Sequence, residues 1–294
     1  MPQVDGVRHR FEAAGGLNFH VAEAGDGEPV VLLHGWPQHW YCWRLVIPEL
    51  ARHYRVLAID LRGFGWTDIA WEGFDKESMA DDVANVMAAL EIDSARIVGH
   101  DWGAWIGYLL ALRRPELVER LVALSTPPPF GKPSLRKLVN LRRFAYQLPI
   151  ASPLGPRLLR RPSYVARKVR RWSRNREHIR NDVQRLYGRD LRASTRARAA
   201  SLLYRTFLLH EAGPVLTGRY RKQRLTVPTL VLHGQRDPVL PPVFFEGHGE
   251  NADEMTIEKV PRMGHLLPEE APELVVERVL EFFEAGSPTQ PAVR

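Results

Sequence analysis

The sequence has few of the features that anchor or stabilise proteins outside the cytoplasm. Cys42 is the single cysteine among 294 residues, so the chain can form no intrachain disulfide and has no cysteine spacing typical of a metal site. The first ten residues contain no apolar signal-peptide core, and no apolar run approaches the length of a membrane-spanning helix. These absences predict a soluble, cytoplasmic protein. The chain is also long enough to form one large domain with an insertion.

Acidic residues are scarce in one long segment. Residues 126–225 hold 25 lysines and arginines but four aspartates and glutamates, whereas the rest of the chain holds 16 basic and 30 acidic residues. Such asymmetry indicates a separate module. A basic module of this kind can also attract anionic lipid, nucleic acid or acidic ligands.

Short apolar runs alternate with helical patterns outside the basic segment. Strands are expected over residues 7–12, 17–24, 30–33, 55–60, 95–98, 121–124, 229–232 and 255–260, and helices over 43–52, 78–90 (with Ser78 as N-cap), 104–112 and 273–283. This alternation predicts an α/β fold with a mostly parallel sheet covered by helices on both sides. The loops after Leu33, Ile59, Val98 and Leu124 are then expected to share the rim where reaction centres lie.

The alternation stops at the proline run 126–129. About a hundred residues rich in arginine and leucine follow without a convincing strand, and the strand pattern resumes near residue 229. We therefore predict a core domain formed by residues 1–125 and 226–294 and an all-helical cap formed by residues 126–225. The tail 286–294 is predicted to be disordered.

One short stretch joins an expected strand to an expected helix through a tight turn. It reads Gly99-His100-Asp101-Trp102-Gly103. Glycines at both ends allow a backbone too tight for a side chain, which leaves the middle residue projecting above the sheet. This is the nucleophile-elbow pattern, with aspartate in the position usually held by serine. Asp101 is therefore a candidate nucleophile, although the five residues alone also fit an ordinary turn.

An acid and a histidine follow two strands of the resumed sheet. Asp237 comes after strand 229–232, and His265 comes after strand 255–260. Taken singly, Asp237 fits a turn before Pro238 and His265 fits a loop in solvent. Behind Asp101, however, they complete the chain order nucleophile, acid, histidine that α/β-hydrolases use. We interpret Asp237 as the acid that orients the imidazole of His265.

The loop after strand 30–33 supplies a candidate oxyanion hole. It begins His34-Gly-Trp-Pro37, and in the elbow pattern this loop donates one N–H while the residue after the nucleophile donates the other. These donors would be the backbone N–H groups of Trp36 and Trp102. Core packing is the alternative role for both indoles. The sequence leaves the Trp36-Pro37 bond open to either isomer.

These motifs together resemble the epoxide hydrolases of the α/β-hydrolase superfamily. The residues that carry the resemblance are His34-Gly-Trp-Pro37, Asp60-Leu-Arg-Gly-Phe-Gly65, 99–103, Asp237 and His265. The resemblance implies an α/β-hydrolase fold with a helical cap and a hydrolase that uses no cofactor and no metal. Haloalkane dehalogenases share much of this set, including the Asp-Trp pair, so the core leaves the substrate open.

An aspartate nucleophile restricts the chemistry. Its carboxylate is ionised at neutral pH, so it attacks without a base and forms an alkyl ester at saturated carbon. His265 is then free to activate the water that hydrolyses the ester. The oxyanion hole serves this second step, when charge develops on the carboxyl oxygen of Asp101.

Opening an epoxide also requires a proton for the leaving oxygen. In epoxide hydrolases two cap tyrosines provide it, and the segments 144–148 and 203–205 resemble the family's Tyr-Gln and Tyr-Arg segments. The resemblance therefore implies Tyr146 and Tyr204 as proton donors. The pocket residues are predicted to be Trp36, Trp102, Trp105 and Gln147. The expected substrate is an apolar or aryl epoxide, in a detoxification role, and a homodimer is a further expectation.

Three alternatives stay open. A haloalkane dehalogenase would use the same Asp101, with Trp102 and a cap tryptophan such as Trp172 holding the halide. A fluoroacetate-type dehalogenase is disfavoured, because arginines are expected just after the nucleophile where Trp102 and Trp105 stand. A non-catalytic binding protein on the same scaffold would use the basic cap as its working surface, but no member of the triad is missing.

The arginine-rich stretch 167–180 is the strongest candidate for a binding surface. It could contact anionic membranes weakly. A solvated helical face is the simpler interpretation, and we expect no nucleic-acid binding because the sequence has no nucleic-acid motif.

Overall fold

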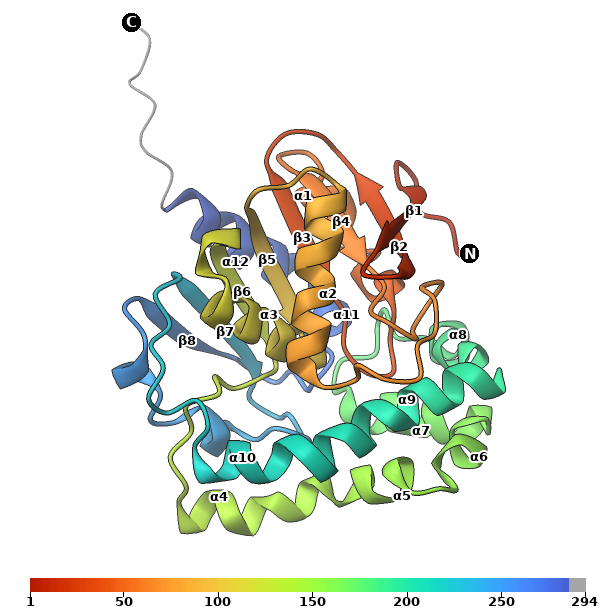
Figure 1. The fold of residues 1–294 in the computed structure, drawn as a ribbon, viewed down its shortest axis with the longest axis vertical. Coiled ribbons are helices and arrows are strands. Elements are labelled where there is room, and N and C mark those ends of the chain that lie inside the picture. The colour runs from red at the N-terminus through yellow and green to blue at the C-terminus, as the bar shows by residue number, and fades with distance from the viewer. Residues whose placement is uncertain (286–294) are drawn as a thin grey trace, which may run out of the picture.

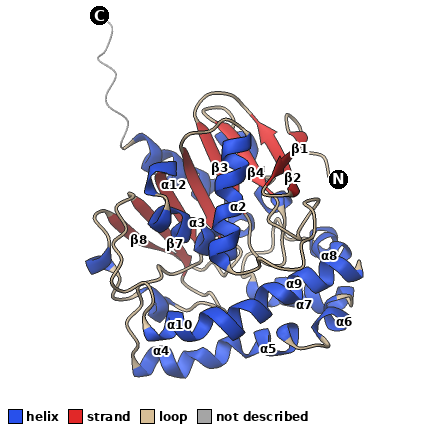
Figure 2. Ribbon diagram, in the orientation of Figure 1, coloured by secondary structure: helices blue, strands red, loops and turns tan. Residues whose placement is uncertain are grey.

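Eight strands form one sheet in a computed structural model that describes residues 1–285 (Figures 1 and 2). The strands are β1 (Arg8–Ala14), β2 (Leu17–Ala24), β3 (Pro29–Leu33), β4 (Arg55–Ile59), β5 (Ala95–His100), β6 (Val118–Leu124), β7 (Thr229–Gly234) and β8 (Met255–Val260). Their order across the sheet is β1-β2-β4-β3-β5-β6-β7-β8. The pairs β1–β2 and β2–β4 are antiparallel and the other pairs are parallel, which confirms the predicted α/β fold.

Helices cover the sheet and fill the segment between β6 and β7. The core contains α1 (Ile47–Leu50), α2 (Lys76–Ala89), α3 (Trp102–Arg113), α11 (Leu267–Glu270) and α12 (Pro272–Glu284). Between β6 and β7 lie α4 (Leu135–Asn140), α5 (Gln147–Ala151), α6 (Gly155–Leu159), α7 (Pro162–Trp172), α8 (Asn181–Asp190), α9 (Ser194–Thr206) and α10 (Ala212–Thr217). Short 3-10 turns cover Trp40–Trp43, Pro115–Leu117, Leu141–Tyr146, Pro242–Phe245 and Gly249–Asn251, and a π-helical turn covers Phe207–Glu211. No described helix is both long and apolar enough to cross a membrane.

The chain reverses its direction across the sheet at β3. The chain passes from β3 to β4 on one side, and β5 then pairs with the opposite side of β3. The loops that follow β3 and β5 therefore run in opposite directions and leave a crevice between them, the position that ligands occupy in open α/β sheets. The helical insertion between β6 and β7, residues 126–225, lies across this edge of the sheet (Figure 1).

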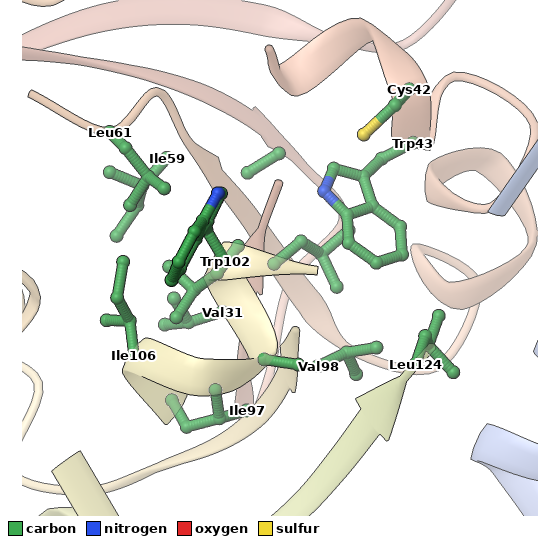
Figure 3. Close-up of a cluster of buried hydrophobic side chains, with 14 of the residues drawn as sticks. Val31, Cys42, Trp43, Ile59, Leu61, Ile97, Val98, Trp102, Ile106 and Leu124 are labelled. Carbon is green, nitrogen blue, oxygen red and sulfur yellow. The ribbon is translucent and has the colours of Figure 1, made fainter. Parts of the chain in front are cut away.

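The core is built from apolar runs that are buried on both faces of the sheet. Every residue of β5 and β7 is buried, and helices α2 and α3 pack on one face. Figure 3 shows Val31 and Ile97 from neighbouring strands on the side of Ile106 of α3, and Val98 on the opposite side near Leu124. Burying an aliphatic side chain of this kind contributes about 1.5–3 kcal/mol, so truncating Val98 to alanine would loosen the strand that carries residue 101.

The helix predicted over residues 43–52 is wrong. A 3-10 turn covers Trp40–Trp43, and α1 is limited to one turn, Ile47–Leu50. A longer helix would place Pro48 in its interior, where proline has no N–H to donate and clashes with the preceding turn. The backbone N–H of Trp40 donates instead to the buried carboxylate of Asp60 at 2.7 Å.

The predicted helix over residues 78–90 is confirmed, but its predicted N-cap is wrong. Helix α2 begins at Lys76, and Asp75 is the N-cap. The Asp75 carboxylate accepts a hydrogen bond from the backbone N–H of Ser78 at 2.9 Å and another from its hydroxyl at 2.7 Å. Ser78 thus occupies the third helical position. Both residue types satisfy helix N–H groups, so the sequence pattern did not separate them.

The other predicted elements lie where the sequence places them, apart from their ends. Predicted helix 104–112 is α3, predicted helix 273–283 is α12, and β6 extends three residues before its predicted start at residue 121. The predicted helical insertion is confirmed. The tail 286–294, predicted to be disordered, lies outside the described residues.

Candidate active site

Asp101 sits on a strained turn between β5 and α3. Its φ of 53° and ψ of −120° lie in a region that side chains other than glycine rarely adopt. A Cβ on Gly99 would lie 2.5 Å from the Cα of Ala104, and one on Gly103 would lie 2.2 Å from the carbonyl oxygen of Leu33. Both glycines are therefore required by close backbone approach, and the turn directs Asp101 into the crevice.

The loop after β3 supplies a hydrogen bond to this aspartate. The backbone N–H of Trp36 donates to Asp101 Oδ1 at 2.9 Å. A Cβ on Gly35 would lie 2.3 Å from the Cβ of Asp101, so a side chain at residue 35 would push the loop away. The Trp36-Pro37 bond, left open by the sequence, is cis.

His265 lies between the two predicted carboxylates. Its Nδ1 is 2.7 Å from Asp237 Oδ2, and its Nε2 is 3.3 Å from Asp101 Oδ2. Asp237 Oδ1 accepts hydrogen bonds from the backbone N–H groups of Val239 (2.7 Å) and Leu240 (3.0 Å). The loops after β5, β7 and β8 thus bring together the three residues that the sequence singled out.

Charges within this triad favour the ionised forms of His265 and Asp101. Burial alone would lower the pKa of His265, but the carboxylates of Asp237 and Asp101 outweigh it and raise that pKa to about 10. Burial alone would raise the pKa of Asp101, but hydrogen bonding and charge from His265, with the N–H of Trp102, lower it. At neutral pH the arrangement is an imidazolium held between carboxylates.

Two contacts that the sequence analysis missed hold the His265 backbone. His100 Nε2 donates to the carbonyl oxygen of His265 at 2.8 Å, and the N–H of His265 donates to the carbonyl oxygen of Trp172 at 3.0 Å. Burial lowers the pKa of His100 to about 4, so it acts as a neutral donor. The second contact comes from the end of α7, so the helical insertion helps to hold the histidine.

Glu270, also missed, ties this histidine loop to the insertion. Its carboxylate accepts hydrogen bonds from four backbone N–H groups, those of Gly264 (2.8 Å), Leu266 (2.9 Å), Arg174 (2.7 Å) and Asn175 (3.0 Å). The first two flank His265, and the last two follow α7. Glu270 is 1% exposed, and a buried carboxylate persists only when its oxygens are satisfied in this way. The sequence offered only an acidic pair after the histidine.

Two tyrosines from the insertion approach the triad. Tyr146 ends the 3-10 turn Leu141–Tyr146, Tyr204 lies in α9, and their ring centroids are 6.0 Å apart. Burial and the nearby charge of Asp101 raise the pKa of Tyr146, and burial raises that of Tyr204. Both hydroxyls therefore carry their protons at neutral pH. Their rings pack edge to face, and the ring of Tyr204 packs in the same way on Trp102 at 5.6 Å, so the two tyrosines form one cluster next to the elbow.

A cavity of about 380 Å³ opens beside Asp101. Its lining includes the predicted pocket residues Trp102, Trp105 and Gln147, together with Tyr146. Most of the remaining lining is apolar, contributed by Pro127, Pro128, Pro129, Leu138, Leu141, Phe144, Phe207, Leu208, Val215, Leu216, Val239, Leu240 and Phe244. The cavity therefore suits a small apolar ligand.

Trp36 does not line this cavity, contrary to its predicted place in the pocket. Its side chain is 1% exposed and packs against Trp172 and Tyr204, with ring centroids 5.4 Å and 5.5 Å apart. The backbone of Trp36 reaches Asp101 while the indole fills the junction between core and insertion. The two roles that the sequence left open are thus divided between the backbone and the side chain.

A buried ion pair behind Trp102 also joins core and insertion. Lys76 Nζ donates to Glu211 Oε1 at 2.8 Å and to the carbonyl oxygen of Leu203 at 3.1 Å, next to Tyr204. The ammonium lies 4.8 Å from the centre of a Trp102 ring, a cation–π distance. Burial lowers the pKa of Lys76, and Glu211 opposes that shift. A lysine and a glutamate 135 residues apart carried no sequence signal.

Within residues 1–285 no three histidine, cysteine, aspartate or glutamate side chains are grouped closely enough to hold a metal ion.

The family profile of the alpha/beta hydrolase fold matches residues 28–244. The chain belongs to this family. The match begins just before β3 and ends past the cavity-lining residue Val239, so it includes the elbow and the whole insertion.

Several relatives of this alpha/beta hydrolase are named epoxide hydrolases, which confirms the predicted resemblance. It is 44% identical over 122 residues to the soluble epoxide hydrolase of Corynebacterium sp. (strain C12), covering 42% of this chain and 43% of that one. It is 35% identical over 150 residues to human epoxide hydrolase 4, covering 49% and 41%. The solved structure of the epoxide hydrolase CorEH superimposes with a TM-score of 0.82 at 29% identity, over 95% and 99% of the two chains. The matched regions span less than half of the two curated relatives.

Proposed function

We propose that this alpha/beta hydrolase is an epoxide hydrolase, which converts an apolar epoxide and water into a vicinal diol. The observation that carries the proposal is the pair of protonated tyrosines, Tyr146 and Tyr204, which pack on one another next to the elbow, with Tyr146 lining the same cavity as Asp101. A carboxylate suffices to attack saturated carbon, but the epoxide oxygen needs a proton as it leaves. Asp101 and Tyr146 line the same apolar cavity, and Tyr204, which does not line it, packs against Tyr146 and Trp102.

In the first step Asp101 Oδ2 attacks an epoxide carbon. That carbon's bond to the ring oxygen breaks, and the oxygen takes a proton from Tyr146 or Tyr204. Asp101 Oδ1 keeps its hydrogen bond from Trp36 throughout. The product is an alkyl ester on Asp101. The phenolate then recovers a proton as His265 loses one, because the ester has removed one of the two negative charges that raised the pKa of His265.

In the second step neutral His265 takes a proton from water, and the hydroxide attacks the ester carbon of Asp101. Asp237 holds the imidazole through its Nδ1, which keeps Nε2 toward the ester. Charge develops on Asp101 Oδ1, where the N–H groups of Trp36 and Trp102 stabilise it. The ester bond breaks and the diol oxygen takes the proton from His265. The new carboxyl group of Asp101 then gives its proton to His265, so the enzyme returns to its starting state and one epoxide and one water have become one diol.

We also assign residues 126–225 as a cap domain over a core formed by residues 1–125 and 226–294. Strands and their covering helices make up the described core, and helices and short turns make up the cap. The substrate cavity lies between them, with Asp101 and Trp102 from one side and Tyr146 and Phe207 from the other. In this division the cap supplies the acid and the core supplies the nucleophile and base.

The haloalkane dehalogenase alternative receives less support from the geometry. It requires a cap tryptophan whose indole N–H reaches the halide beside that of Trp102. Trp172 packs on Trp36 (5.4 Å) and Tyr146 (5.0 Å) and does not line the cavity, whereas Tyr146 lines it together with Asp101. The non-catalytic alternative lacks support because the triad is complete and hydrogen-bonded.

Parallel assays with styrene oxide, a fatty-acid epoxide and a bromoalkane test the proposal. We expect diol from at least one epoxide and no bromide. Bromide without diol would overturn the assignment in favour of a dehalogenase. In a single turnover in heavy-oxygen water with enzyme in excess, the label should enter Asp101 before it enters the diol, because water attacks the ester carbon.

A further inference from the structure

The outer face of the helical insertion exposes an unusual number of large apolar side chains. Of the ten such side chains exposed in residues 1–285, seven lie in the insertion. They are Leu135 (77% exposed), Leu138 (53%), Val139 (56%), Leu148 (63%), Leu154 (61%), Leu209 (69%) and Leu216 (52%). Scattered exposed leucines are ordinary, but a concentration of them in one module indicates a contact surface.

Part of this surface surrounds the mouth of the substrate cavity. Leu138 of α4 and Leu216 of α10 both line the cavity and are more than half exposed, so they lie where it opens. Leu135 and Val139, on the same helix as Leu138, line a shallow groove against Pro241 and neighbouring residues. Figure 1 shows α4 and α10 side by side at the lower edge of the molecule. We call these exposed residues, Leu135, Leu138, Val139 and Leu216, the mouth patch.

Cations are interleaved with the mouth patch. Arg136 and Lys137 lie between Leu135 and Leu138 in the sequence, and the exposed Arg142 and Arg143 follow. Lys132 lines the cavity near its opening and pairs with Glu250. A short helical segment with outward leucines and flanking cations is the pattern of an element that lies in a membrane interface.

We propose that the mouth patch docks on anionic lipid bilayers and that the cavity takes up its ligand from the membrane. The leucines would enter the headgroup boundary while the cations meet lipid phosphates. The uptake part of this proposal rests on the proposed function, since apolar epoxides partition into bilayers. The docking part does not depend on it.

The alternatives for this surface fit less well. A second copy of the chain would bring two strongly basic modules together, because residues 126–225 hold 25 basic and four acidic residues. Like charges at an interface oppose association. Nucleic acid would match the cations but leave the leucines exposed.

The arginine-rich stretch 167–180 is a weaker membrane candidate than the mouth patch. In α7 the apolar residues Val165, Val169 and Trp172 are all buried in the protein. The nearby cleft is lined largely by arginines, among them Arg170, Arg176 and Arg180. That face can offer charge but no apolar side chain to insert.

Co-sedimentation with vesicles tests the docking. The protein should sediment with vesicles containing a quarter phosphatidylglycerol in phosphatidylcholine at low salt, and less so as salt rises. The variant Leu135→Asp/Val139→Asp should lower the partition coefficient at least tenfold. Phe11→Asp is the matched control, because Phe11 is 53% exposed on β1, far from α4 in Figure 1, and it should bind as the wild type does.

Three results would overturn the docking: no binding to anionic vesicles at low salt, equal loss in the Phe11 control, or a stable dimer by ultracentrifugation that Leu135→Asp/Val139→Asp disrupts. The melting temperature of each variant checks folding, since both changed side chains are exposed. Leu135→Ala/Val139→Ala, which adds no charge, should weaken binding to a smaller extent in the same direction.

Activity separates failure of the docking from failure of the proposed function. With a long-chain epoxide dissolved in anionic vesicles, diol formation should be several-fold faster in the wild type than in Leu135→Asp/Val139→Asp. With styrene oxide in solution, the two should be equal, since neither changed residue lines the cavity. Vesicle binding without diol from any substrate would refute the proposed function and leave the docking intact. Equal rates from vesicles would refute membrane uptake alone.

Discussion

The core and the insertion hold their proposed working groups in different ways. Asp101 and the N–H of Trp36 are placed by the backbone: a left-handed φ at Asp101 and glycines with no room for a side chain. Tyr146 and Tyr204 lie on helical elements and are placed by side-chain packing against one another and against Trp172 and Trp102. The backbone around Asp101 therefore tolerates few substitutions. In the insertion, by contrast, a change in side-chain packing can alter which leaving group the site is able to protonate or bind.

The two regions also differ in charge, and their junction is polar. The core is acidic and the insertion basic. Carboxylates of the core reach into the insertion: Glu270 binds the N–H groups after α7, and Glu269 accepts from Arg44 and from the hydroxyl of Tyr187 at 3.0 Å. Buried groups of this kind specify one relative placement because every alternative leaves them unpaired. The following experiments probe each side of the comparison and then the junction.

The largest effect is expected from the core. His265→Gln should reduce turnover by roughly 10³-fold or more, because His265 is the proposed base that activates water at the ester. The first step needs no base, so the Asp101 ester should accumulate. Mass spectrometry of the intact protein after adding an epoxide should show one substrate mass added. Absence of that adduct, with diol formation retained, would contradict the assigned base.

The insertion should contribute a smaller but specific effect. Tyr146→Phe and Tyr204→Phe should each slow ester formation about 10–100-fold, and the double change should nearly abolish it, because the leaving oxygen then lacks a proton donor. Stopped-flow tryptophan fluorescence can follow the step. Tyr164→Phe is the matched control, since Tyr164 also lies in the insertion but, beyond the effect of burial, the charge of Asp101 raises the pKa of Tyr146 and Tyr204 and not that of Tyr164. An active double variant would mean that other groups protonate the oxygen.

Disturbing the junction should slow the second step. Glu270→Gln keeps the size of the side chain but loses charge and one acceptor for the N–H groups around His265. We expect ester hydrolysis to slow about 10-fold with ester formation little changed, because a small displacement of the base has this order of cost. The rate of the pre-steady-state burst reports ester formation and the steady-state rate reports ester hydrolysis, so comparing the two shows which step is slowed. Equal slowing of both steps would indicate general loosening instead of a displaced base.

The ion pair behind Trp102 should govern stability more than turnover. Lys76→Met leaves the Glu211 carboxylate buried without its charged partner, which should cost about 3–5 kcal/mol of unfolding free energy. Lys76→Met/Glu211→Gln removes both charges and should cost less than Lys76→Met alone. Urea unfolding gives the three values. A double variant less stable than the single one would contradict the pairing.

The smallest effect concerns the pH dependence of stability. The carboxylates of Asp237 and Asp101 raise the pKa of His265 to about 10 in the folded chain, above its ordinary value of 6.5. Protonation therefore favours the folded state: the stabilisation is full below pH 6.5 and is lost as pH rises through about 10. The difference in unfolding free energy between wild type and His265→Gln should shrink over that range. A constant difference would mean that His265 is neutral throughout.

Sequence patterns located the proposed catalytic groups of the core but not the residues that support them. Asp101, Asp237 and His265 each follow an apolar strand, so the parallel sheet alone brings them to one edge. His100, Glu270, Lys76 and Glu211 act through contacts between segments far apart in the chain, and such contacts have no local pattern. Trp36 shows the same limit. Its place after a strand predicted the role of its backbone N–H, but the position of its indole depends on packing against the helices of the insertion.

The sequence by itself determined the alternation of strands and helices, the strained elbow with aspartate at its tip, and the basic helical insertion. These are local properties: apolar periodicity, glycine at turns and the count of charges along the chain. Only the tertiary structure decided which side chains face the cavity, where the cavity opens and what couples the two regions. Those depend on packing between segments, and packing is settled by shape and by the pairing of buried polar groups.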